Sequence, residues 1–207
     1  MERLIHMVND IGGIKMKYYL LGYSDDNKDN LNGKSPILVN LYKLGGFDLR
    51  NLWVGKHIEQ WPNNIELYYE KGEVLLDFIP NVLSWLIFTD KGVNIIKNLN
   101  KNEIQVFPVQ ISRKGNKVKS YYVNVVNVTA SVAAFDWDKS EYISWEDDPE
   151  YIKYIRKIVL KADSVYRNLD IFRLDESKNY IIVSERIKKE FEKEKIVGCR
   201  FTPIQMV

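Results

Sequence analysis

The last strongly patterned stretch of the chain predicts a strand, a helix and a second strand. Its apolar run, residues 180–183, is followed by Ser184, whose hydroxyl can accept a hydrogen bond from an amide in the first turn of a helix. Ile187 and Phe191 lie four positions apart and therefore share one face of that helix. Gly198 stands where such a helix would end, and apolar residues resume after it.

The same order of apolar and polar positions occurs earlier, between Leu86 and Gln110. Thr89 stands 95 positions before Ser184, and Pro108 stands 95 positions before Pro203. Similarity at a fixed offset is the mark of a structural repeat, although two unrelated units can also share common residue types. The sequence therefore predicts two strand–helix–strand units that are candidates for an internal repeat.

Other apolar runs predict the rest of the sheet. Strands are expected over Lys17–Tyr23, Ile37–Tyr42, Ile65–Tyr69 and Val118–Val128, the last only partly covered because asparagines fall on both of its faces. Residues 156–160 fit either a strand or a helix, and we favour a strand. Asp148 and Pro149 together suit the start of a short helix.

These elements indicate an α+β fold with a mostly antiparallel sheet. Residues 1–15 are expected to form an N-terminal extension, ending at the Gly12–Gly13 pair. Residues 16–207 are expected to form a single domain, with a possible division into lobes at about 16–135 and 136–207. A chain of 207 residues, 45% of them hydrophobic, can build a sizeable core.

Composition and charge exclude several classes of protein. The net charge of +2 is too small to indicate binding to nucleic acid or to an anionic membrane, and we expect neither partner. The basic turn from Arg113 to Lys119 is better explained as a charged hairpin tip. A single cysteine fits a reducing compartment. Without a signal peptide or a long apolar run, the sequence predicts a cytoplasmic protein.

Catalytic and metal-binding patterns were sought and not found. The chain has two histidines, His6 and His57, far apart in sequence, and Cys199 is best explained as a small apolar residue of a strand. No phosphate loop, nucleophile elbow or zinc spacing is present. The acidic loop from Ser24 to Ser35 lacks the ligand order of a calcium loop. We therefore expect no cofactor, no metal and no catalysis.

One stretch shifts strongly in composition and is our candidate binding surface. Between positions 136 and 150 seven acids stand against one lysine, with Trp and Tyr interleaved. Aromatic residues of these types are enriched at binding hot spots, and acids would attract a basic partner surface. Tryptophans in the core with acids facing water would give the same pattern. The candidate residues are Asp136, Trp137, Asp138, Glu141, Tyr142, Trp145, Glu146, Asp147 and Asp148.

Several short patches in fixed order carry a family resemblance. They are Met16–Leu21, Leu76–Ile79, Tyr121–Val128 with Asp136 and Ser140 after it, Ile171–Leu174, Ile182–Arg186, Gly198 and Arg200–Ile204. In these patches the chain resembles immunity-protein family eleven of bacterial polymorphic toxin systems, which was first catalogued as a domain of unknown function.

The resemblance implies a protein that binds and neutralises a cognate toxin C-terminal domain inside the producing cell. It implies no chemistry of its own. Two other classes remain open from the residues alone: a small hydrolase or nucleotide-processing enzyme with a cryptic site, and a general protein-interaction module. The oligomeric state is left open by the sequence.

Overall fold

The computed structural model describes residues 16–24, 36–39, 47–62, 65–70, 72, 74–100, 103–113, 116–149, 151–165 and 169–207. The predicted extension, residues 1–15, and most of the acidic loop 24–35 lie outside this part of the chain. The elements in chain order are β1 (Tyr18–Tyr23), β2 (Pro36–Val39), α2 (Arg50–Trp53), β3 (Glu66–Tyr69), β4 (Leu86–Phe88), α3 (Asp90–Leu99), β5 (Ile104–Arg113), β6 (Asn116–Val128), β7 (Ser131–Val132), β8 (Glu141–Ser144), β9 (Ile152–Lys157), β10 (Val159–Leu160), the 3-10 turn η2 (Ala162–Ser164), β11 (Ile171–Leu174), β12 (Ser177–Ser184), α4 (Glu185–Lys193) and β13 (Cys199–Met206).

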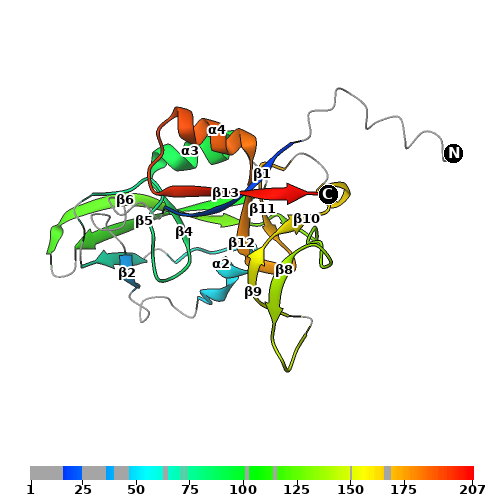
Figure 1. Cartoon of the computed structure of the whole chain (residues 1–207). Helices are drawn as coiled ribbons and strands as arrows, with labels where there is room; N and C mark the ends of the chain where they lie inside the picture. The colour runs from blue at the N-terminus through cyan, green and yellow to red at the C-terminus, as the bar shows by residue number, and fades with distance from the viewer. Residues whose placement is uncertain are drawn as a thin grey trace.

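The described strands form two larger sheets and one two-stranded ribbon (Figure 1). The six-stranded sheet has the order β10-β13-β1-β12-β11-β7, and the five-stranded sheet has the order β2-β3-β5-β6-β4. The predicted α+β class is therefore confirmed. Most pairings are antiparallel, but β10–β13, β11–β7 and β3–β5 are parallel. Both larger sheets are thus mixed, which the sequence pattern did not predict.

The first predicted strand–helix–strand unit is β4, α3 and β5. Its two strands do not pair with each other, because β6 lies between them and is antiparallel to both. Val125 of β6 pairs with Ile87 on one side and with Phe107 on the other. Because β6 is an interior strand, Val125 and the three residues after it are all buried. The expectation that this strand is only partly covered was wrong for that end.

The second unit, β12, α4 and β13, has the same arrangement around a different middle strand. Here β1 lies between β12 and β13, so the six-stranded sheet combines strands from both ends of the described chain. Leu20 of β1 pairs with Ile182 and with Thr202. These two residues lie 95 positions after Ile87 and Phe107, so the units agree in topology and in register. Their origin as an internal repeat stays a prediction.

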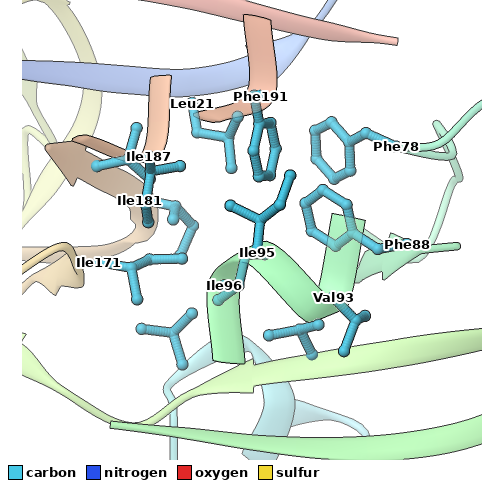
Figure 2. Packing of buried hydrophobic residues seen from close by; sticks show 13 residues of the cluster. Leu21, Phe78, Phe88, Val93, Ile95, Ile96, Ile171, Ile181, Ile187 and Phe191 are labelled. Carbon is cyan, nitrogen blue, oxygen red and sulfur yellow. The ribbon is translucent and has the colours of Figure 1, made fainter. Parts of the chain in front are cut away.

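The main core lies where the two larger sheets and the two longer helices meet. Phe191 and Ile187 of α4 point toward Ile96 of α3 and toward Phe88 at the end of β4 (Figure 2). Phe191 is almost fully buried, with ring centroids 6.1 Å from Phe88 and 5.9 Å from Phe201. The predicted apolar face of the second helix is confirmed.

Each of the larger sheets also has a second covered face. The other face of the five-stranded sheet packs against the segments that contain Leu52 and Trp85. The other face of the six-stranded sheet packs against the chain between β7 and β10, where Phe135 and Leu160 are fully buried. The favoured strand over residues 156–160 is confirmed, as the end of β9 and all of β10.

The two helices begin at N-cap residues that bind a preceding aspartate in the same way. The amide of Ser184 donates to the carbonyl of Asp170, and its hydroxyl donates to Oδ1 of the same residue. The amide and hydroxyl of Thr89 donate likewise to Asp77, at 2.9 and 2.7 Å. Ser184 also accepts from the amide of Ile187 at 3.4 Å, which confirms the predicted cap. Thr89 makes no such cap bond.

Candidate functional site

The acidic candidate stretch forms the β8–β9 ribbon and the turn that leads into it. Figure 1 shows this ribbon at the side of the molecule away from α3 and α4, with its loop extending from the body. The strands are antiparallel, with Tyr142 opposite Ile155 and Ile143 opposite Tyr154. The loop is closed by turns at Trp145 and Asp148, so the short helix expected at Asp148–Pro149 is wrong.

An aromatic cluster joins the ribbon to the core. The buried ring of Phe135 meets Trp137 edge-on at 5.1 Å and Tyr142 at 5.6 Å, and the last two rings lie 5.2 Å apart. The amide of Ile155 donates to the hydroxyl of Tyr180 on β12 at 3.0 Å. These contacts fix the inner side of the ribbon. Trp137 keeps part of its ring in solvent, whereas Tyr142 serves mainly as packing.

Asp136 differs from the other acids of the candidate stretch. It is buried, and its Oδ1 accepts from the amides of Asp138 at 3.1 Å and Lys139 at 3.0 Å. Its backbone continues the network, because its carbonyl accepts from the amide of Ser140. Asp136 therefore shapes the turn before β8 and does not offer a free carboxylate. From sequence it could not be separated from its exposed neighbours.

The outward side of the ribbon carries four large exposed side chains. Ile143 is 42% exposed, Trp145 52%, Tyr151 65% and Tyr154 54%. Lys153 lies over the indole of Trp145, with Nζ 4.7 Å from the ring centroid. Only Trp145 was among the sequence candidates. The other three could have been found from alternation with the buried Ile155, but only once the pairing of the two strands is known.

The charges on the ribbon are divided between its parts. Five candidate acids are exposed and form no ion pair with any described residue: Asp138, Glu141, Glu146, Asp147 and Asp148. Strand β9 instead carries Lys153, Arg156 and Lys157, all exposed. The loop is therefore acidic and the base of the ribbon is basic, with the apolar side chains between them.

The residues weighed for catalysis lie in separate elements. His57 is exposed after α2, with its Nε2 3.3 Å from Nε2 of Gln105. Cys199 begins β13 and packs, partly buried, against the main core. Within the described ranges no three His, Cys, Asp or Glu side chains are grouped to hold a metal ion. Arg113 ends β5 at the predicted hairpin tip, and its side chain is exposed.

An exposed, rigidly mounted row of aromatic and aliphatic side chains is typical of protein-interaction domains. The α+β fold with this ribbon is therefore that of a protein-binding domain. Residues 21–206 match the Immunity protein family (Imm11), and the chain belongs to that family. A comparison with curated proteins gives no match. In the part of the chain that the structure describes, no helix is both long and apolar enough to cross a membrane.

Proposed function

We propose that the chain binds and neutralises a cognate polymorphic-toxin domain in the cytoplasm of the bacterial cell that produces the toxin. Membership of the Imm11 family supports an immunity function. The proposal adds that the protein acts by binding, without catalysis, and that the outward side of the β8–β9 ribbon contacts the toxin.

The observation that carries this proposal is the exposure of Ile143, Trp145, Tyr151 and Tyr154 on one ribbon. Isolated exposed apolar residues are common, but a contiguous group of them marks an interaction site. Trp and Tyr are the residues most often found as hot spots, because they bury a large area at a small loss of side-chain entropy. The aromatic cluster below the ribbon holds this surface in place before the partner arrives.

The acidic loop suits a toxin with a basic surface. Unpaired carboxylates at Glu146, Asp147 and Asp148 would raise the association rate with a positively charged cleft. A stable complex buries about 1,600 Å² in total, so the ribbon forms only part of the interface. The basic base of the ribbon, at Arg156 and Lys157, is the adjoining surface.

The test uses a catalytically inactive form of the toxin domain encoded beside the gene for this chain. Trp145→Ala should raise the dissociation rate about tenfold or more, because a hot-spot side chain contributes on the order of 2 kcal/mol. Asp147→Lys combined with Asp148→Lys should lower the association rate and change its dependence on salt. Surface plasmon resonance at two salt concentrations measures both rates.

A matched control places the same change in net charge on α4, on the other side of the molecule. Glu192→Lys combined with Glu194→Lys should leave the association rate close to that of the unmodified protein. Circular dichroism confirms the fold of each variant. Binding kinetics that are unchanged in both ribbon variants would reject the ribbon as the contact surface, and absence of binding by the unmodified chain would reject the proposed function itself.

A further inference from the structure

A cleft of about 440 Å³ opens between the two larger sheets. Its floor on one side comes from the six-stranded sheet, with Leu21 of β1, Ile181 of β12 and Arg173 of β11. Its other side comes from Leu86 of β4 and from Trp53 at the end of α2. The main core with α3 and α4 lies deeper in the same space between the sheets. This cleft is separate from the β8–β9 ribbon.

The only charged residue that lines the cleft is Arg173, which is 4% exposed. Its Nε donates to the carbonyl of Val128 at 2.8 Å, and its Nη2 donates to that of Leu52 at 2.8 Å. Its Nη1 donates to the carbonyls of Trp53 at 3.1 Å and Lys178 at 2.7 Å. A guanidinium has five N–H groups, so one N–H of Nη2 has no acceptor among the described residues.

The positive charge of Arg173 has no carboxylate partner in the described part of the chain. Burial lowers the pKa of its guanidinium to about 10, which still leaves the group protonated at neutral pH. Four carbonyl dipoles offset a part of the charge. A buried charge without a counter-ion is costly, and an anion beside it would be held strongly because little water screens the pair.

The walls of the cleft suit the apolar part of a ligand. Leu21, Phe78, Leu86 and Ile181 supply apolar surface, and Trp53 stands partly exposed at the edge. A pocket of this size, mostly apolar with one convergent charged group, is the usual form of a small-molecule site.

The mouth of the cleft includes a strained backbone position. Ser84 lines the mouth with a φ of 55°, a left-handed conformation that is unfavourable for a residue other than glycine. The amides on either side, of Leu83 and Trp85, both donate to Oδ1 of Asn81 at 3.1 Å and hold the turn in this shape. Residues held in such conformations are concentrated at ligand sites.

We propose that this cleft binds a small organic carboxylate with an apolar body, its carboxylate against Arg173 and its body between Leu86 and Ile181. The site is independent of toxin binding by the ribbon. It gives the protein a ligand-binding function beyond immunity.

The first test compares two ligands of the same shape on the unmodified protein. Isothermal titration calorimetry at pH 7 should show saturable binding of 3-phenylpropionate. The uncharged 3-phenylpropanamide should bind about 10- to 100-fold more weakly, because it loses the charge-assisted hydrogen bond to Arg173. Equal affinity for the two compounds, or no saturable binding of the carboxylate, would overturn the proposal.

The second test fills the cleft. Leu86→Trp places an indole between the walls and should reduce the affinity for 3-phenylpropionate at least about tenfold. Val74→Trp adds the same group at an exposed position that does not line the cleft, and should leave the affinity unchanged. Undiminished binding by a folded Leu86→Trp protein would place the carboxylate elsewhere on the molecule. If that variant fails to fold, the comparison of the two ligands still decides the question.

Discussion

Ser184→Ala should destabilise the protein by more than the loss of an ordinary helix cap. A cap hydroxyl contributes about 1 kcal/mol, and the sequence alone supports no larger figure. In the structure the same hydroxyl also donates to Oδ1 of Asp170, a carboxylate that is almost fully buried. The alanine variant therefore removes the cap and leaves a buried charged acceptor without its donor.

The structure sets the size of this effect. An unsatisfied buried acceptor costs about 1–3 kcal/mol, more when it is charged. Arg186 remains paired with Oδ2 of Asp170 at 2.5 Å, but the side chain of Arg186 is 53% exposed, so this pair contributes at most about 1 kcal/mol. Adding the lost cap gives an expected loss of about 2–4 kcal/mol in the free energy of unfolding.

Thr89→Ala provides a matched control within the same chain. Thr89 donates to Asp77 as Ser184 donates to Asp170, but it makes no cap bond. Asp77 lies nearer to solvent, and its Oδ2 accepts from the amide of Val197 at 3.1 Å. Water can replace the lost hydroxyl there, so we expect a loss of only about 0.5–1.5 kcal/mol.

Urea denaturation followed by circular dichroism measures both variants. The slope with urea should stay constant, so that a change in midpoint reports stability alone. Equal losses in the two variants, or a loss below about 1 kcal/mol for Ser184→Ala, would refute the reasoning that burial of Asp170 makes its hydroxyl partner important.

Two further predictions concern the core and the response to alkali. Phe191→Ala should lower the free energy of unfolding by about 3–5 kcal/mol, because it empties a space between Phe88 and Phe201, and Phe191→Leu should cost less. Urea midpoints test this, and a loss near zero for the alanine variant would contradict it. Burial raises the pKa of the Tyr23 hydroxyl to about 12. The neutral phenol therefore stabilises the fold fully below about pH 10, the pKa of an unfolded tyrosine, and this stability is lost as the pH rises toward 12. Tyr23→Phe should weaken the fall in stability over that range, and identical pH slopes for the two proteins would exclude this role for Tyr23.

Local patterns explain why the strand–helix–strand units could be predicted from sequence. The cap at Ser184, the apolar pair Ile187 and Phe191 and the stop at Gly198 are signals that lie within one short stretch. Gly198 has a φ of 93°, and a Cβ there would lie 2.4 Å from the carbonyl oxygen of Phe78. The local requirement and the tertiary contact select the same residue, so the prediction of the helix end is confirmed.

Contacts between distant segments explain what the sequence could not show. Asn127 looked like a sign of a solvent-exposed face, yet it is fully buried because it donates to the carbonyl of Lys56 at 2.8 Å and to Oε1 of Gln105 at 3.1 Å. The acceptors of Arg173 are backbone carbonyls, which any residue type provides, and that of Leu52 lies 121 positions away. The outward side of the ribbon depended on strand register in the same way.

The position of β1 has a consequence for the order in which the protein becomes folded during synthesis. Tyr18–Tyr23 pairs on one side with β12 and on the other with β13, so its partners are among the last residues to leave the ribosome. At about 5–20 residues per second the segment between them takes roughly 10–40 s to translate. Throughout that interval the apolar β1 strand has neither neighbour. Its exposure to chaperones and to other nascent chains is set by translation speed, and truncation before β13 would leave one edge of β1 unpaired.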